Sequence, residues 1–128
     1  MKPELMYLLF SALLTFVQVL IAAAAANQVV GLNTLAGNRD DLPTLTGFAG
    51  RARRAHLNMI ENMVLFTALV AVAVLANKTN AMTAAGAMLF FWARLVYAVI
   101  YLIGIPWLRT VAWFAAVIGL VLIGIQLF

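Results

Sequence analysis

Four long apolar runs, separated by short polar segments, make up most of this chain. The runs cover approximately residues 5–30, 50–77, 81–103 and 106–128. Each run reaches or exceeds the roughly 20 residues that a helix needs to cross the hydrocarbon core of a membrane. The pattern therefore predicts an all-α integral membrane protein, a bundle of four transmembrane helices in a single domain.

The polar connections also carry helix and turn signals. Residues 31–50 form the longest one and are rich in glycine, asparagine, aspartate and proline, so we expect a loop there. Residues 77–80 form a short turn. The third run ends at Gly104, because Pro106 cannot continue the helical hydrogen-bond ladder but suits the first turn of a new helix.

The first run has some features of a cleaved signal peptide. Lys2 precedes an apolar stretch, and the small residues 22–26 resemble a cleavage zone. However, the apolar stretch is longer than a signal core, and Glu4 weakens the basic start. We interpret the run as a retained transmembrane helix.

Composition narrows the class of protein further. Hydrophobic residues make up 66% of the 128 residues and charged residues 9%, which is too apolar for a soluble domain of this length. The net charge is +4, but the basic residues are dispersed and no aromatic residues interleave with them, so we expect no nucleic-acid partner. The absence of cysteine excludes disulfides and a protein thiol nucleophile. Any thiol chemistry would need a ligand that supplies the sulfur.

The basic residues are distributed unequally between the two ends of the predicted bundle. The first connection and the following helix opening hold four arginines, and Arg109 follows the third connection. The opposite side holds only Lys2 and Lys78. The positive-inside rule therefore predicts that the first and third connections are cytoplasmic.

Polar residues in the second run fall on one helix face. At about 100° per residue they share an arc of roughly 100°, while His56 and Arg53 point elsewhere. Arginine binds carboxylates, glutamate accepts hydrogen bonds from an ammonium group, and asparagine bonds to both donors and acceptors. A peptide-like ligand would therefore match this face. An internal salt bridge to Glu61 from Arg54 or Arg94 is the structural alternative. The residues of this face are Arg51, Arg54, Asn58, Glu61 and Asn62.

The third run carries a second polar face. Arg94, Tyr97 and Tyr101 are spaced i, i+3 and i+7 and therefore lie on one side of a helix. Arg94 is in the middle of the run, where a charge must face a partner or a cavity rather than lipid. Membrane-interface anchoring is the alternative for the two tyrosines, but their position above Arg94 favours a shared polar cleft.

Arg109 admits two interpretations. It anchors the fourth helix at the membrane interface, or it places a positive charge beside a cleft, where it would favour the reactive thiolate form of a bound thiol. Trp107 and Trp113 are most simply interfacial anchors. His56 is most simply an interfacial polar residue or a contact between subunits. A lone histidine is weak evidence for a metal, and we expect no metal site.

Two segments resemble motifs of one membrane family. The second run opens with Arg-Ala-His-Leu-Asn-Met-Ile-Glu-Asn at residues 54–62, and the third contains Arg-Leu-Val-Tyr-Ala-Val-Ile-Tyr at residues 94–101. With four spans in this order over nearly the whole chain, they resemble bacterial members of the membrane-associated proteins in eicosanoid and glutathione metabolism, the MAPEG family.

This resemblance implies a homotrimer in a bacterial inner membrane, with glutathione as co-substrate bound between subunits. It implies a transferase or peroxidase that conjugates or reduces lipophilic electrophiles reaching it from the membrane lipids. Arg109 would be the catalytic residue that stabilises the glutathione thiolate. The other implied glutathione contacts are Arg54, Asn58, Glu61, Arg94, Tyr97, Tyr101 and, towards the ligand of the adjacent subunit, His56.

The chain departs from the family pattern at three places. Gln28, Val29 and Val30 stand where family enzymes often carry an arginine, and Asn62 occupies a position that is aromatic in some members. The spacing from Tyr101 to Arg109 differs by about one residue. These departures keep a second hypothesis open, a non-catalytic membrane scaffold of the same family that binds a lipid or an anionic ligand. A small proton-coupled exporter is less favoured, because so many arginines surround Glu61.

Overall fold

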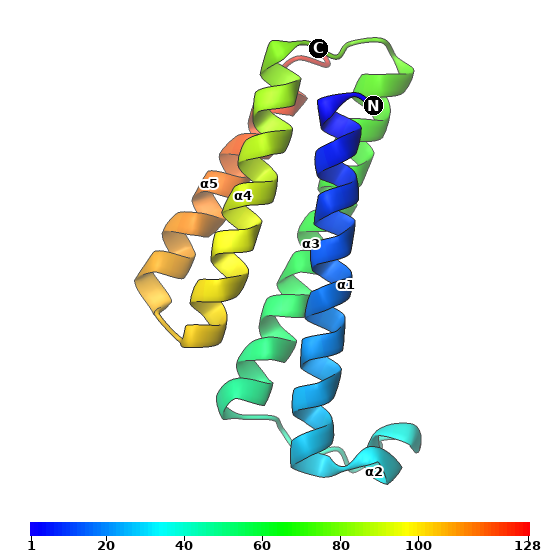
Figure 1. Cartoon of the computed structure of the whole chain (residues 1–128), viewed down its shortest axis with the longest axis vertical. Helices are drawn as coiled ribbons and strands as arrows, with labels where there is room; N and C mark the ends of the chain where they lie inside the picture. Colours follow the sequence, from blue (N-terminus) through cyan, green and yellow to red (C-terminus); the bar gives the residue numbers. More distant parts are fainter.

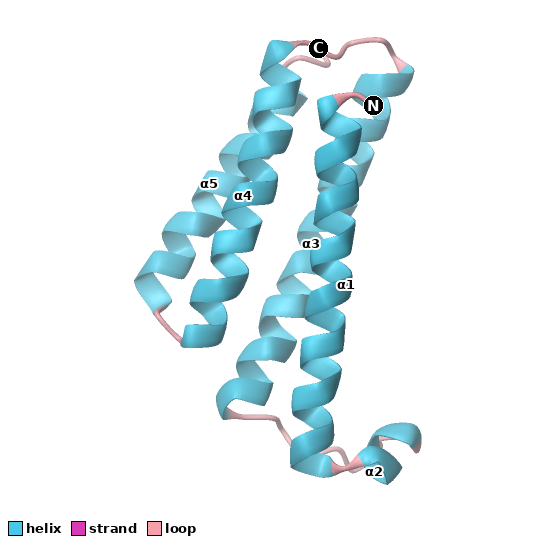
Figure 2. Ribbon diagram, in the orientation of Figure 1, coloured by secondary structure: helices cyan, strands magenta, loops and turns pink.

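The computed structural model describes all 128 residues and contains helices and loops only (Figures 1 and 2). Four of the five helices are long and apolar enough to cross a membrane. This confirms the predicted all-α, four-helix membrane architecture. The helices are α1 (Pro3–Val30), α2 (Leu32–Ala36), α3 (Gly47–Leu75), α4 (Ala81–Ile103) and α5 (Pro106–Gly124).

The four long helices form two antiparallel pairs, α1 with α3 and α4 with α5 (Figure 1). Both chain termini lie at one end of the bundle, together with the α3–α4 turn. The other end carries α2 and the α4–α5 turn, and there the α1–α3 pair extends beyond α4 and α5. The first and third connections therefore share one end of the molecule.

Two glycines bring α4 and α5 into close contact. A Cβ atom added at Gly119 would lie 2.7 Å from the carbonyl oxygen of Gly86, and a Cβ at Gly86 would lie 2.7 Å from the carbonyl oxygen of Gly119. In a membrane, where lipid tails are as apolar as leucine, small residues favour helix association by letting backbones approach. This contact makes α4 and α5 the most closely packed pair in the bundle.

The apolar core sets the register between α3 and α4. The rings of Phe66 and Phe90 stack with their centroids 4.0 Å apart, and both side chains are completely buried. Met59, Val70 and Ile123 extend the same cluster. Because α3 and α4 run in opposite directions, this stacking places residues near 62 of α3 level with residues near 94 of α4.

Polar side chains join the helices at the end that holds both termini. Glu4 is only 2% exposed and accepts a hydrogen bond from the Thr83 hydroxyl. The side chain of Asn80 caps α4 through the amide nitrogens of residues 82 and 83. Lys2 donates to the Thr79 hydroxyl at 3.1 Å. Glu4 is therefore a buried acceptor between α1 and α4, not just a charge at the start of the chain.

Some helix boundaries differ from those that the sequence predicts. The expected loop over residues 31–50 contains the short helix α2, and α3 begins at Gly47 rather than near residue 50. Leu45 and Ala49 pack against Ala25 and Ala26, with Leu35 beside them. This apolar cluster stabilises the earlier start of α3, because it buries side chains that a free loop would expose.

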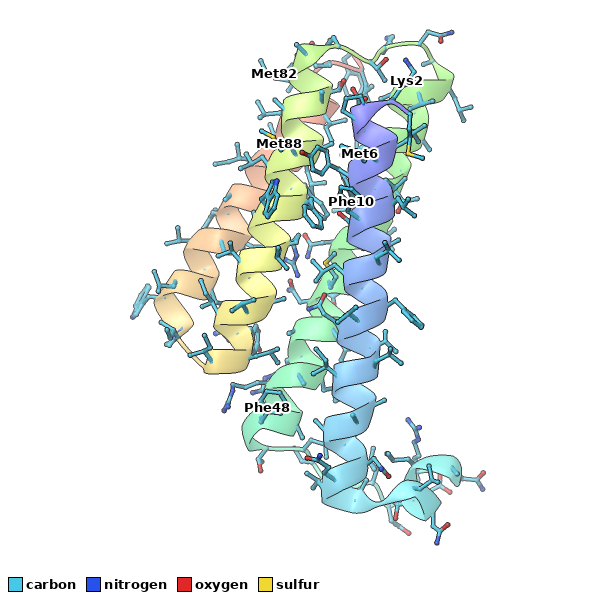
Figure 3. The ribbon with its side chains drawn as sticks, viewed as in Figure 1. Lys2, Met6, Phe10, Phe48, Met82 and Met88 are labelled. Carbon is cyan, nitrogen blue, oxygen red and sulfur yellow. The ribbon has the colours of Figure 1, made fainter.

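The outer surface of the bundle is apolar. Figure 3 shows Met6 and Phe10 of α1 and Met88 of α4 in the half of the molecule that contains Lys2. The Phe10 ring lies 5.7 Å from that of Phe91, yet Phe10 is still 38% exposed. Phe48 marks the opposite half, at the opening of α3 (Figure 3). Such exposed apolar side chains suit contact with lipid.

Candidate functional site

Tyr101 connects three helices at the end of the bundle that holds α2 and the α4–α5 turn. Its hydroxyl accepts a hydrogen bond from Nε of Arg54 at 3.1 Å, from α3. From α5, the guanidinium carbon of Arg109 lies 4.7 Å from the centre of its ring. A cation over an aromatic face is attracted by the ring's electron density. One tyrosine of α4 therefore positions an arginine from each neighbouring helix.

Small residues allow this contact between the three helices. Ala55 of α3 is 1% exposed and Ala112 of α5 is 7% exposed, and both pack with Tyr97 and Tyr101. Larger side chains at these two alanines would hold α3 and α5 away from the tyrosines. The ring centroids of Tyr97 and Tyr101 are 5.5 Å apart at an angle of 60°, which is a favourable edge-on geometry.

Arg94 lies deeper in the bundle on the same face of α4. It is 1% exposed, and none of its three guanidinium nitrogens has a hydrogen-bond partner in the chain. Its guanidinium carbon lies 4.1 Å from the centre of the Tyr97 ring. The alternative in which Glu61 pairs with Arg94 does not apply to this structure, and Arg54 bonds to Tyr101 instead.

A cleft of about 310 Å³ opens beside the paired tyrosines. Four predicted site residues, Asn58, Tyr97, Tyr101 and Arg109, line it from three different helices. Drug-sized ligands typically occupy about 300–1,000 Å³, so this cleft is at the small end of that range. It combines one positive charge with tyrosine hydroxyls and an amide.

Glu61 and Asn62 are not part of the cleft wall. Glu61 is exposed on α3. Asn62 is buried, and its side-chain amide donates to the carbonyl oxygen of Asn58 at 2.8 Å and to the side-chain oxygen of the same residue at 3.3 Å. This bond holds the Asn58 side chain. Asn62 is thus a support for a cleft residue, although helix phasing alone puts it in the same stripe as Glu61.

His56 faces a different part of the molecule. It lines a groove of about 270 Å³ between α1, α3 and the loop that follows α2. Arg39 and Arg53 border the same groove, and its remaining lining residues are apolar. The buried Nδ1 atom of His56 has no partner within the chain. Within one chain, the structure therefore separates His56 from the other predicted site residues.

Two cleft residues and one further arginine, Arg51, were not among the predicted contacts. Thr110 and Trp113 line the cleft beside Arg109. Trp113 lies one helical turn after Arg109, and that i, i+4 spacing is the signal that could have placed it there. Arg51, on the edge of the polar stripe, donates from Nε to the carbonyl oxygen of Leu102 at 3.2 Å. That bond joins two helices far apart in sequence, and no local pattern predicts it.

These features define a four-span membrane protein with a cationic, tyrosine-lined cleft at one end of its helix bundle. The chain belongs to the MAPEG family, because the family model matches residues 5–128. A search of curated proteins and a search of solved structures return no match to the chain.

Proposed function

We propose that this protein is a membrane-bound, glutathione-dependent transferase or peroxidase that conjugates or reduces lipophilic electrophiles. The observation that carries the proposal is the position of Arg109, which lies over the Tyr101 ring at the border of the cleft. A fixed positive charge favours the thiolate form of a nearby thiol, and the thiolate is the nucleophile. In a conjugation, the sulfur forms a bond to the electrophilic carbon and the leaving group departs with its electron pair.

The chemistry of the cleft supports glutathione as the co-substrate. Glutathione has two carboxylates, an amine and two peptide bonds, and it supplies the sulfur that this cysteine-free chain lacks. Arg54 does not line the cleft itself, but its bond to Tyr101 holds it beside the cleft, where it presents a guanidinium for a carboxylate. Asn58 lines the cleft and offers both a donor and an acceptor for a peptide group. The hydroxyls of Tyr97 and Tyr101 add two further hydrogen-bonding groups for the same ligand.

The remaining predicted contacts support a homotrimer. Glu61 and His56 lie outside the cleft of their own chain, and His56 has an unpartnered buried nitrogen. In a trimer, a neighbouring copy would supply these groups and enlarge a cleft that is small for a tripeptide. An open apolar groove on α1 and α3 suits a helix contact, because small side chains line much of it. Its lining residues are Ala12, Thr15, Ile60, Met63, Val64, Thr67, Ala68 and Ala71.

The distribution of charge supports an orientation in the membrane. Five of the chain's eight basic residues belong to the connections and helix ends at the α2 end of the bundle. We infer from the positive-inside rule that this end is cytoplasmic. The resemblance to bacterial members of the family favours a bacterial inner membrane. Glutathione would then enter the cleft from the cytoplasm, while the lipophilic electrophile reaches it from the bilayer.

Activity towards a lipophilic electrophile tests the catalytic role of Arg109. We expect Arg109→Gln to lower kcat by about 10²-fold or more, in line with the loss of one preorganised electrostatic group. Lys78→Gln, which removes a positive charge from the other end of the bundle, is the control and should keep wild-type turnover. Unchanged turnover in Arg109→Gln would contradict the thiolate role. Calorimetry that detects no glutathione binding at millimolar concentration would contradict the whole proposal.

A non-catalytic scaffold of the same family remains the second candidate, and the end of α1 favours it. The last turn of α1 has no basic residue, with Gln28, Val29 and Val30 at its close. A scaffold would use the same cleft for a lipid or another anionic ligand. Thermal stabilisation by lipids but not by glutathione would support this candidate over the enzyme.

A further inference from the structure

Two polar side chains of α1 are buried in the bundle without a partner in the chain. Ser11 is completely buried, and Gln18 is 6% exposed. Neither the hydroxyl oxygen Oγ of Ser11 nor the side-chain oxygen Oε1 of Gln18 makes a hydrogen bond within the chain. Most buried polar atoms in proteins are paired, because an unpaired atom has lost its hydrogen bonds to water. The proposed glutathione contacts involve neither residue.

Both side chains lie on the face of α1 that is turned into the bundle. Ser11 and Gln18 are seven residues apart, about two helical turns, so they share one side of the helix. Leu14 lies between them and packs against the core cluster that includes Met59 and Ala93. The two polar side chains therefore point towards α3 and α4 rather than towards lipid.

The contact between Glu4 and Thr83 sets the register of α1 against α4. The two helices run in the same direction (Figure 1), and the Thr83 hydroxyl donates to the Glu4 carboxylate. Eleven residues lead from Thr83 to Arg94, and the same number leads from Glu4 to residue 15 of α1. Arg94 is therefore level with the segment between Ser11 and Gln18. At about 1.5 Å per residue, it lies roughly 4–6 Å in height from each of them.

Arg94 carries the donors that these two oxygens lack. Its guanidinium is buried, and Nε, Nη1 and Nη2 have no partner in the chain. Asn62 of α3 lies at the same level, but its amide group already donates to Asn58. An arginine side chain has donors only, whereas the side-chain oxygen of glutamine is an acceptor. The unpaired groups of α1 and α4 are therefore chemically complementary.

We propose that Gln18 is a positioning residue for Arg94, and that a water molecule shared with Ser11 bridges the Gln18 oxygen to the guanidinium. Buried waters make two to four hydrogen bonds, which these three side chains supply. The Tyr97 ring, 4.1 Å from the guanidinium carbon, holds one face of Arg94, and the bridge fixes the direction of its nitrogens. α1 thereby supports the proposed glutathione site without contacting the ligand. The effect on glutathione rests on the proposed function, whereas the link between α1 and α4 does not.

A double-mutant cycle on thermal unfolding tests the link without glutathione. Gln18→Leu removes an acceptor from a buried charge, so it should lower the unfolding midpoint of the full chain in detergent by about 3–6 °C. In the Arg94→Met background the same substitution removes an unpaired polar group, and the midpoint should stay the same or rise. The difference between the two backgrounds measures the coupling. Gln28→Leu is the matched control, because this glutamine of α1 is exposed, and its effect should be equal in both backgrounds.

Calorimetry with glutathione tests the positioning role. Gln18→Leu should bind glutathione about three- to tenfold more weakly than the wild type, the range for one lost hydrogen bond. Thr83→Val is the control, because it also breaks a buried polar contact between α1 and α4. It should lower the unfolding midpoint and leave the glutathione affinity unchanged, as a residue with a structural role alone would do.

A third variant keeps the test decisive if Gln18→Leu does not fold. Gln18→Glu retains an acceptor and adds a negative charge opposite Arg94. Its unfolding midpoint should be at least that of the wild type, but it should fall in the Arg94→Met background, where the buried carboxylate has no cation.

The outcomes separate this inference from the proposed function. Equal effects of the Gln18 substitutions in both backgrounds overturn the link to Arg94. Wild-type glutathione affinity in Gln18→Leu overturns the positioning role. If the wild-type protein itself binds no glutathione, the proposed function fails, and the unfolding cycle alone decides whether Gln18 holds Arg94.

Discussion

Arg109 lies over the face of Tyr101, with its guanidinium carbon 4.7 Å from the ring centre. The hydroxyl of the same tyrosine accepts a hydrogen bond from Arg54. The two functions of this side chain are therefore chemically separable: its ring supports the arginine of α5, and its hydroxyl supports the arginine of α3. In the proposed enzyme the first arginine acts on the thiolate and the second on a carboxylate of glutathione.

Two substitutions at Tyr101 should distinguish these functions. We expect Tyr101→Phe to weaken glutathione binding by about two- to tenfold, the range for one lost hydrogen bond, while kcat stays close to that of the wild type. Tyr101→Leu also removes the ring, and the lost cation–π contact should lower kcat as well. Steady-state kinetics that separate kcat from KM provide the measurement. Identical kinetic changes in both variants would show that the ring makes no separate contribution.

Replacement of Arg94 should separate stability from ligand binding. Its side chain is 1% exposed and its nitrogens have no partner within the chain, so the fold bears the cost of a desolvated charge. Replacing buried charges by apolar residues of similar volume is often neutral or stabilising. We expect Arg94→Met to have an unchanged or higher unfolding midpoint without ligand.

The same Arg94 variant should bind glutathione about tenfold or more weakly if Arg94 contacts the ligand. Arg94→Lys is the comparison, because it keeps a positive charge but loses the planar group that stacks on Tyr97. Calorimetry measures the affinity, and a thermal melt measures the stability. A large fall of the unfolding midpoint in Arg94→Met would contradict the prediction that the buried charge is costly.

The close crossing of α4 and α5 should not tolerate a methyl group. In Gly119→Ala, the new Cβ atom would lie 2.7 Å from the Gly86 carbonyl oxygen and 2.9 Å from the Phe90 amide nitrogen. The two helices would have to separate, and we expect a loss of about 1–3 kcal/mol in stability. Thermal unfolding in detergent measures this loss.

Gly124→Ala is the matched control for that experiment. This glycine lies in the same helix, but the nearest atom to an added Cβ is a Leu69 methyl carbon at 4.0 Å. That distance is ordinary van der Waals contact, so the substitution should leave the unfolding midpoint almost unchanged. Equal effects at both glycines would point to loss of a glycine in general rather than to the helix crossing.

Thr83 should stabilise the end of the bundle that is far from the cleft. Its hydroxyl bonds to the buried Glu4 and accepts from the Asn80 amide nitrogen at 2.8 Å. Thr83→Val keeps the shape but leaves a buried carboxylate without its partner. We expect a loss of about 1–3 kcal/mol in stability with no change in glutathione affinity.

Thr79→Val is the comparison for Thr83→Val. The Thr79 hydroxyl accepts a hydrogen bond from Lys2, but that bond is exposed to solvent. Its loss should change stability by only a few tenths of a kcal/mol, roughly as for other exposed polar contacts. A comparable fall in the unfolding midpoint for both threonine variants would mean that burial of Glu4 does not matter.

Local patterns in the sequence predict the four long helices of this protein and their polar faces. Four apolar runs of sufficient length leave helices as the only way to satisfy the backbone in a membrane. Within one helix, the 3.6-residue repeat puts Arg94, Tyr97 and Tyr101 on one side whatever the neighbouring helices do. The helical starts near residues 81 and 106 follow in the same way from local turn and proline chemistry.

Which of these faces meet depends on how the helices pack against one another. The Phe66–Phe90 stacking and the Gly86–Gly119 crossing set the registers of α3 and α5 against α4. Those registers bring Arg109 onto Tyr101, leave Glu61 on the outside and direct His56 into a separate groove. Contacts between helices depend on side-chain volumes far apart in the chain, and a shift of one turn would exchange every partner. For this reason the polar faces were predictable from local periodicity, whereas the contacts of Arg54 and Arg109 with Tyr101 were not.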